Sequence, residues 1–556
     1  MGRLRRIGSA AAGAALAGVA AYDLRQKRHA ILRNFPVVGH FRYLLEEVGP
    51  ELRQYIVTSN DEERPFSRDQ RRWVYASSKR EINTFGFGTD NDLENVEGGL
   101  LVLKQAMFPA PPPQKGTVGS GPEYVLPCAK VLGAAHGRRH AFRPRSVVNI
   151  SGMSYGSLSP VAVEALNRGA ALAPCLHNTG EGGLAPAHKQ GGELIYQIGT
   201  GYFGCRGEDG RFSLERLRDR IAEAPVRAIE IKLSQGAKPG LGGMLPGAKV
   251  TAEIAAIRGV PEGEDCVSPA RHTAFSNVDE LIEFVETVAE DTGLPVGIKG
   301  AVGRIEFWEE LAQRMAATGG GPDYVAIDGA EGGTGAAPLT FSDHVALPFK
   351  VGFSRAFAAF ARAGITDDVV FVGAGRLGLP DTALFGFALG VDMVHVAREA
   401  MLAIGCIQAQ RCHTDTCPTG VATHSKWLMR GLDPTLKGAR AANYVRALRG
   451  ELLSLSRSCG VRHPSLMTPD HVEIVQEGFG TARLEELFGY EPEWRDISSD
   501  RAREIEALLG PDAGAPPQPG PESGPVVGDE SGAGEGSGEQ EMASARGGSG
   551  GAAGGD

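Results

Sequence analysis

The sequence predicts an α/β fold built around a (β/α)8 TIM barrel, with a helical N-terminal extension, C-terminal helices and a disordered tail. Between residues 146 and 430, short runs rich in β-branched residues alternate with amphipathic helical stretches, which is typical of parallel strands joined by helices. Eight such runs match the strand number of a closed barrel. They read VVNISG, CLHNTG, IYQIGTG, RAIEIKLS, PVGIKG, YVAIDGA, VVFVGAGR and MVHVAR.

Polar side chains stand near the ends of five of these runs. In a barrel the carboxyl ends of the strands meet at one face, and active sites are built on that face. We therefore expect an amide, two lysines, a carboxylate and a guanidinium to surround one site. These residues are Asn178, Lys232, Lys299, Asp328 and Arg376.

The segments outside the barrel differ from it in composition. Residues 31–145 combine helical stretches with a proline-rich loop, and residues 431–510 predict a helical C-terminal extension. Residues 511–556 consist mainly of Gly, Ala, Ser, Pro and Glu. Large apolar residues are too few there to offset the entropy of ordering the backbone, so we expect a disordered, low-complexity tail.

Residues 1–30 form an apolar N-terminal segment. The run from Ile7 to Tyr22 is uncharged and lies between two basic groups. It is shorter than the roughly 20 residues that a bilayer-spanning helix needs, and it consists mostly of Ala and Gly. We interpret the segment as a weak membrane anchor on a cytoplasmic enzyme, and a plain surface helix is the alternative.

The overall composition excludes some classes of function. The chain has 57 Lys and Arg against 67 Asp and Glu, and its net charge of -10 gives no basic surface for binding nucleic acid. Eight cysteines in 556 residues are too few for a disulfide scaffold. Three of them crowd into one short stretch, which indicates metal chemistry in a reducing, cytoplasmic compartment.

The strongest local motif is C-x5-C-x4-C, formed by Cys406, Cys412 and Cys417. Three neighbouring thiolates can each ligate one iron, and their number matches a three-iron cluster. A structural zinc site would need C-x2-C pairs or a fourth ligand, for which His413 and His424 are the candidates. We favour an iron–sulfur cluster, with zinc and plain buried thiols as the alternatives.

Two glycine-rich turns, AEGGTGAAP and GAGRLG, follow late strands. Their bare N–H groups can surround a phosphate, and phosphate sites of barrels usually lie at the late strands. The phosphate of FMN fits both turns. The second turn also satisfies G-x-G-x-x-G through Gly373, Gly375 and Gly378, which would indicate NAD. The acid that NAD binding requires should close the next strand, however, and Asp392 opens it.

A further loop carries Lys232, Gln235, Lys238 and Lys249 within EIKLSQGAKPGLGGMLPGAKV. Such a glycine-rich loop can close over an anionic substrate, and a solvated lysine loop is the alternative. The other motifs around it favour the first interpretation.

Five motifs together resemble, in order and spacing, the FMN-binding synthase domain of glutamate synthase, over about residues 147–470. They are SGMSYGSLS, NTGEGG, EIKLSQGAKPGLGG, DGAEGGTGA and CIQAQRCHTDTCPTGVATH. The chain resembles in particular the stand-alone members of that family, which also begin with a short apolar segment. The resemblance implies FMN, a 3Fe-4S cluster, addition of ammonia to 2-oxoglutarate, and hydride delivery from reduced flavin to the resulting 2-iminoglutarate.

The resemblance also implies roles for individual residues. Glu181 and Lys238 would act in catalysis, with Glu181 managing the protons of the imine. Gln235, Lys238 and Arg258 would bind the carboxylates of the oxoacid. The flavin ring would be lined by Met153, Ser154 and Gly156, with Gln197 and Lys299 nearby; its phosphate would be held by Gly332, Gly333, Gly373 and Gly375, and the cluster by Cys406, Cys412 and Cys417.

The chain departs from the family pattern at a few positions. Leu241 and Met244 replace Glu and Gln of QGAKPGEGGQLPG, and Tyr202 replaces Arg of SGRFG. In SPPPHH, His272 is kept and Thr273 replaces the second His. These changes concern the substrate loop more than the flavin site.

The function implied is that of a glutamate synthase-like oxidoreductase acting on CH-NH2 groups. We expect the nitrogen to come from ammonia or a small amine, free or supplied by a separate glutaminase subunit. Electrons are expected from a donor protein, either ferredoxin or a reductase subunit. Two alternatives are a subunit of a glutamate–amine transferase, such as N-methylglutamate synthase, and a membrane-associated flavin and iron–sulfur electron-transfer protein.

Overall fold

A computed structural model describes residues 2–60, 62–84, 86–89, 93, 99–113, 125–477 and 480–510. The predicted tail, residues 511–556, lies outside these described residues.

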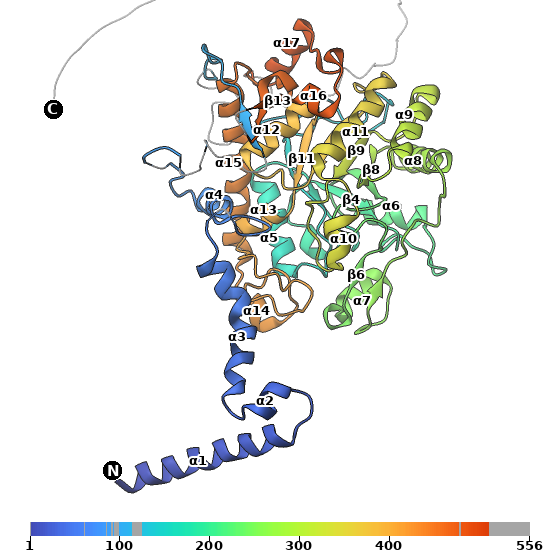
Figure 1. Cartoon of the computed structure of the whole chain (residues 1–556). Helices are drawn as coiled ribbons and strands as arrows, with labels where there is room; N and C mark the ends of the chain where they lie inside the picture. The colour runs from blue at the N-terminus through green and yellow to red at the C-terminus, as the bar shows by residue number, and fades with distance from the viewer. Residues whose placement is uncertain are drawn as a thin grey trace, which may run out of the picture. The chain divides into compact units, whose positions relative to one another are not determined.

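Eight parallel strands close into a barrel, which confirms the predicted fold class (Figure 1). Each strand coincides with one of the eight runs read from the sequence. The strands are short and buried along their whole length apart from two half-exposed positions in β5, as expected for a sheet covered by helices. In barrel order they are β10 (Val370–Ala374), β11 (Met393–Val396), β2 (Val148–Ile150), β3 (His177–Asn178), β4 (Leu194–Ile198), β5 (Val226–Lys232), β8 (Val296–Gly300) and β9 (Tyr324–Asp328).

Helices surround the barrel, and several begin at a residue that caps the first turn. The side chains of Ser159, Ser213 and Asn277 each accept a hydrogen bond from a backbone N–H three residues later. The surrounding helices are α5 (Pro160–Leu172), α6 (Leu214–Ala222), α8 (Val278–Thr292), α9 (Glu306–Thr318), α11 (Phe349–Arg362), α12 (Pro380–Leu389) and α13 (Arg398–Ala403).

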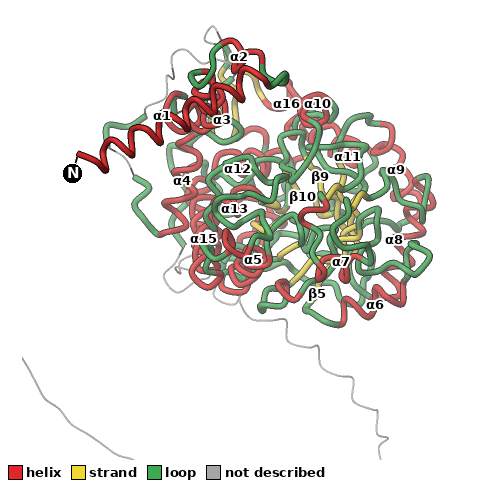
Figure 2. The backbone as a smooth tube through the Cα atoms, turned by 90° about the horizontal axis from the view of Figure 1, so that it is seen from below, coloured by secondary structure: helices red, strands yellow, loops and turns green. Residues whose placement is uncertain are grey.

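The long helix α15 (Pro434–Ser458) packs along α5, and the two lie side by side in both views (Figure 2). Glycine permits this close approach, because a Cβ on Gly169 of α5 would lie 2.6 Å from the Cβ of Ala441 on α15. The other C-terminal elements are α16 (Leu484–Phe488), α17 (Ser499–Ala507) and strands β12 (Val472–Val475) and β13 (Thr481–Arg483). β12 is the middle strand of a three-stranded sheet, between β1 (Leu100–Leu103) and β13.

Short elements are inserted at the carboxyl ends of the barrel strands or lie between larger ones. They comprise β6 (Met244–Leu245), β7 (Cys266–Val267), α7 (Ala252–Arg258), α10 (Leu339–His344) and α14 (Lys426–Met429), with 3-10 turns at Pro186–His188, Gly247–Lys249, Pro464–Leu466, Pro469–His471 and Pro492–Arg495.

The N-terminal segment is helical. It contains α1 (Gly2–Arg25), α2 (Ala30–Asn34), α3 (Gly39–Leu52), a π-helical turn (Arg53–Val57) and α4 (Arg68–Lys79). Within the described residues, no helix combines the length and apolar character needed to cross a membrane.

The interior of the barrel changes from apolar to polar along the strands. Near their amino ends, Tyr324, Val370 and Met393 cluster with Leu132 and Phe142, which pair across an antiparallel bridge. Side chains alternate between the two faces of a strand, and toward the carboxyl ends most of those that point into the barrel are polar. They are Asn178, Gln197, Glu230, Lys232, Lys299, Asp328 and His395. This polarity places the chemistry at the carboxyl end.

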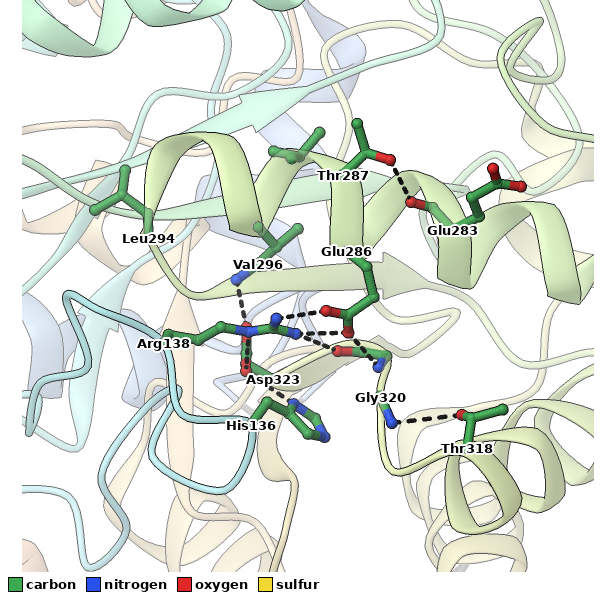
Figure 3. Close-up of polar contacts among 12 residues, drawn as sticks. His136, Arg138, Glu283, Glu286, Thr287, Leu294, Val296, Thr318, Gly320 and Asp323 are labelled. Atoms are coloured by element: carbon green, nitrogen blue, oxygen red, sulfur yellow. Dashed lines mark hydrogen bonds and ion pairs between the residues drawn. The ribbon is translucent and has the colours of Figure 1, made fainter.

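An arginine network closes the opposite, amino-terminal end (Figure 3). Arg138 donates to both oxygens of Asp323 (3.0 and 3.1 Å) and of Glu286 (2.6 and 2.7 Å). Asp323 also accepts from the N–H of Val296 at 2.7 Å and contacts His136 at 2.9 Å. Since Val296 begins β8 and Asp323 precedes β9, the network joins two strand starts to α8. Its place at this end indicates a role in stability.

Candidate active site

A cavity of about 920 Å³ opens at the carboxyl ends of the strands. This volume lies toward the upper end of the range of about 300–1,000 Å³ for ligand sites. Fourteen of the sixteen residues predicted from the sequence line it: Met153, Ser154, Glu181, Gln197, Gln235, Lys238, Arg258, Lys299, Gly332, Gly333, Gly375, Cys406, Cys412 and Cys417.

The two predicted residues that do not line the cavity are glycines. Gly156 lies behind the wall, where its carbonyl accepts from Nε2 of His424 at 2.8 Å. Gly373 faces the helical layer, because a Cβ there would lie 2.7 Å from Leu377. Both glycines permit close packing behind the cavity wall. Their expected contacts with flavin stay predictions, because neither residue lines the cavity.

Glu181 forms the centre of a buried charged cluster. Lys232, which extends from the end of β5, donates to Glu181 at 2.8 Å and to the side-chain oxygen of Gln235 at 2.7 Å. Burial favours the protonated acid, but Lys232, and more weakly Lys238 and Arg258, outweigh it and lower the pKa of Glu181. The cluster therefore holds an ionised carboxylate in a largely water-free place.

Lys238 lies in the same loop as Gln235, and no carboxylate among the described residues forms an ion pair with it. Its Nζ donates to the carbonyl of Ala336 at 3.4 Å. Burial, reinforced by the charge of Lys232, lowers the pKa of Lys238 to about 8. An amine with such a pKa can bind an anion when charged and exchange a proton near neutral pH.

A polar layer of strand residues forms the floor beneath this cluster. Glu230 accepts from Gln197 at 2.6 Å and from Asn178 at 2.8 Å, and Lys299 lies 3.6 Å from Asp328. Burial opposes the charge of Lys299, but Asp328 and Glu230 raise its pKa overall. Conversely, burial and the nearby charge of Lys299 lower the pKa of His395 to about 3. The floor therefore presents a charged lysine beside a neutral histidine.

Two arginines flank the glycine turns. Arg376 and Arg398 both line the cavity, and each guanidinium lies 5.1 Å from the ring centre of Phe66. Burial lowers the pKa of both. Within the described part of the chain neither forms an ion pair, and Nε of Arg376 has no hydrogen-bond partner. Two half-buried cations without an ion-pair partner among the described residues leave room for an anion.

Arg258 lines the cavity from α7, but much of its guanidinium is already engaged. Nη2 donates to the carbonyl of Tyr155 at 2.7 Å, and the group lies 5.1 Å from the ring centre of Phe203. Its Nε is buried without a partner among the described residues. The predicted carboxylate contact is thus compatible with its position, while its bond to Tyr155 fixes the surrounding loop.

The three thiols of the cysteine motif lie at one end of the cavity. Burial raises the pKa of Cys406 to about 12, and the nearby Cys412 and Cys417 contribute in the same direction. Nε2 of His424 donates to the carbonyl of Gly156 at 2.8 Å, so this nitrogen is not available as a fourth ligand. Among the described residues, no three or more His, Cys, Asp or Glu side chains lie close enough to hold a single metal ion.

The N-terminal extension supports the cysteine loop, a role that the sequence did not reveal. Hydroxyls of Tyr75 and Tyr55 donate to the carbonyls of Cys406 and Ile407, each at 2.7 Å. Gln54 donates to the carbonyl of Gln408, also at 2.7 Å. These partners are more than 300 residues apart in sequence, so no local pattern connects them.

Comparisons with known proteins support the resemblance read from the motifs. Residues 131–462 match the family model described as the conserved region in glutamate synthase. The chain is 36% identical to the glutamate synthase large subunit-like protein YerD of Bacillus subtilis, over 84% of this chain and 93% of that protein. It is 32% identical to an archaeal glutamate synthase [NADPH] of Methanocaldococcus jannaschii, over 61% of this chain and 64% of that relative.

Solved structures include a mandelate oxidase at 16% identity and a TM-score of 0.39, covering 68% of this chain and 88% of the other, which is too distant to inform the site. The family match spans more than half of the chain, and YerD is matched over nearly its full length. The chain therefore belongs to the glutamate synthase family and is an enzyme of that family.

Proposed function

We propose that this chain is a glutamate synthase-like oxidoreductase that carries out FMN-dependent reductive amination of 2-oxoglutarate to L-glutamate. One observation carries the proposal. A single cavity is lined by the Glu181–Lys232 cluster, by two arginines without ion-pair partners beside glycine turns, and by three thiols. Each part matches one requirement of the reaction: a dicarboxylate substrate, a flavin phosphate and an entry point for electrons.

The arginines and the glycine turns fit an FMN phosphate. A Cβ on Gly332 would lie 2.9 Å from Asp328, and one on Gly333 would lie 2.7 Å from Arg398, so side chains there would fill the space. Gly332, Gly333 and Gly375 would hold the phosphate with Arg376 and Arg398. The ring would lie toward Met153, Ser154, Gln197 and Lys299. Bound FMN would supply the hydride for the reduction.

The charged cluster fits the substrate. Lys238 and Gln235 would bind the carboxylates of 2-oxoglutarate, with Arg258 at the rim of the same cavity. Glu181, held ionised by Lys232, would accept a proton from the attacking amine and return it as water leaves. Lys232 keeps the carboxylate of Glu181 ionised and therefore able to accept a proton.

Cys406, Cys412 and Cys417 would hold a 3Fe-4S cluster. Three thiols that line the cavity, two of them half-buried and Cys417 buried, fit a cluster that carries electrons from an external ferredoxin or reductase subunit to the interior. The N-terminal extension covers this edge through Tyr55 and Tyr75 and would shield the cluster from water.

A second candidate is a subunit of a glutamate–amine transferase such as N-methylglutamate synthase. Leu241 and Met244, which line the mouth of the cavity, favour it, because they present apolar surface where the related pattern has Glu and Gln. The two functions share the cofactors but not the starting acid. Reductive amination consumes 2-oxoglutarate, whereas the transferase bonds an amine to C2 of glutamate and releases ammonia.

Product analysis tests both candidates. Purified holoenzyme is reduced chemically under anaerobic conditions and mixed with 2-oxoglutarate plus ammonia or methylamine, or with glutamate plus methylamine. Flavin reoxidation is followed by absorbance, and products are identified by mass spectrometry. Glutamate supports the first candidate, and N-methylglutamate supports the second. Reduced flavin that is indifferent to every mixture excludes both and favours an electron-transfer role.

A further inference from the structure

The mouth of the cavity carries large, exposed apolar side chains. Met244 and Val267 are 49% and 62% exposed and lie directly opposite each other in the β6–β7 pair. Leu241, 37% exposed, precedes them, and Leu339, 74% exposed, begins α10. All four line the same cavity as Glu181. We call Leu241, Met244, Val267 and Leu339 the apolar rim.

The apolar rim spans two loops that are connected to each other. Ser342 of α10 donates to the carbonyl of Ala237 at 2.8 Å, and Lys238 donates to the carbonyl of Ala336 at 3.4 Å. β6 and α10 accordingly lie on the same side of the barrel (Figure 1). Lys238 belongs to this junction, so the apolar rim stands beside the charge that would hold a carboxylate.

Apolar side chains grouped at the mouth of a pocket mark a contact surface, because exposing them to water is unfavourable. A small dicarboxylate and ammonia would leave this surface in water. A ligand with a charged head and a hydrocarbon tail would use both parts, placing its head at Lys238 or Glu181 and its tail on the apolar rim. The rim and the charged cluster share one cavity, which favours a substrate over a docking protein.

We propose that one substrate of this enzyme carries a hydrocarbon group that lies on the apolar rim. This inference rests on the reductive amination of the proposed function and replaces one of its two substrates: either the 2-oxo acid has an apolar side chain, or the amine is a primary alkylamine in place of ammonia. The chemistry is unchanged. The amine nitrogen bonds to the 2-oxo carbon, the carbonyl oxygen leaves as water, and reduced flavin contributes the hydride.

Binding measurements test the inference separately from turnover. Oxidised holoenzyme, without an electron donor, is titrated by calorimetry with 2-oxobutanoate, 2-oxohexanoate and 2-oxooctanoate. A second series uses methylamine, butylamine and hexylamine with saturating 2-oxoglutarate. Burying one methylene strengthens binding by about fourfold, so affinity should rise with tail length in one series. The series that responds identifies the substrate that carries the tail.

Variants connect the effect to the apolar rim. Leu241→Asn with Met244→Gln keeps similar volumes and removes apolar surface, so the dependence on tail length should flatten to about twofold or less per methylene. Leu436→Asn is the matched control, because Leu436 is 53% exposed on α15 and does not line the cavity. Flavin content and the thermal midpoint report whether each variant is folded.

The outcomes separate this inference from the proposed function. Affinity that is flat with tail length in both series overturns the inference, including when glutamate is formed from 2-oxoglutarate and ammonia. A tail-length dependence that is unchanged in the double variant also overturns it. A dependence that flattens in the double variant and not in the control supports the apolar rim, even if turnover with 2-oxoglutarate is absent and the proposed function fails.

Discussion

Gln408 and Phe66 exchange two hydrogen bonds although 342 residues separate them in the sequence. The N–H of Phe66 donates to Oε1 of Gln408, and Nε2 of Gln408 donates to the carbonyl of Phe66, both at 3.0 Å. The Phe66 ring also lies against the guanidiniums of Arg376 and Arg398. One residue of the N-terminal extension thus connects the cysteine loop to the proposed phosphate site.

Removing the Gln408 side chain should weaken both sites. Gln408→Ala leaves the buried N–H and carbonyl of Phe66 without partners, which should lower the free energy of unfolding by about 1–3 kcal/mol. Chemical denaturation measures this loss, and flavin content should fall with it. Gln410→Ala is the control, since Gln410 also has a positive φ (55°, against 59° for Gln408) but is exposed. Equal losses in the two variants would contradict the role of this hydrogen-bond pair.

The barrel and the strand-end residues of its site could be predicted from local periodicity, whereas the other site residues came from the resemblance to the glutamate synthase family. Of the five strand-end residues, Lys232, Lys299, Asp328 and Arg376 line the cavity as expected, and Asn178 lies beneath it. Glu230 could have been added, because it stands two residues before Lys232 and points the same way along β5. His395 could have been added in the same way, because it stands near the carboxyl end of β11 and points into the barrel.

Other features depend on contacts between distant segments. Alternation along β10 makes Gly373 face the helices and not the cavity. The match to the glycine-rich turn was therefore insufficient to assign Gly373 to the phosphate. Two departures from the family pattern turn out to be coupled: the hydroxyl of Tyr202 accepts from the N–H of Thr273 at 3.0 Å and contacts His272 at 3.2 Å. The sequence shows these substitutions as separate, whereas the fold brings them together and buries Tyr202.

Iron content tests the cysteine assignment. Cys412→Ala removes one of three ligands, so the iron bound per chain should drop by more than half and the iron–sulfur absorbance should fade. Cys459→Ala provides the comparison, because Cys459 is also buried but lies at the end of α15, away from the motif. Zinc in the wild-type protein, or iron that is unaffected by Cys412→Ala, would exclude the cluster.

The affinity for 2-oxoglutarate should depend on pH through Lys238. Its pKa is lowered to about 8, so the ammonium is charged below this pH and neutral above it. Binding of the dianion should therefore weaken as the pH rises through about 8. Lys238→Arg remains charged because the guanidinium pKa exceeds about 12, and its affinity should stay flat over the same range. If the affinity of the wild type and of Lys238→Arg falls in the same way with pH, a group other than Lys238 titrates.

The last prediction separates substrate binding from flavin binding. Lys238 belongs to the proposed oxoacid site, and the proposed phosphate site would be built from other residues of the same cavity, namely Arg376, Arg398 and the glycine turns. Losing one charge-assisted contact of about 1.5–3 kcal/mol should weaken 2-oxoglutarate binding roughly 10- to 150-fold. Lys238→Ala should therefore keep its flavin and its yellow colour but lose reoxidation of reduced flavin by 2-oxoglutarate and ammonia. Lys238→Met keeps most of the side-chain volume and should behave like Lys238→Ala, because both variants lose the charge. If Lys238→Met restores reoxidation, Lys238 acts through packing, and the dicarboxylate must be held elsewhere in the cavity.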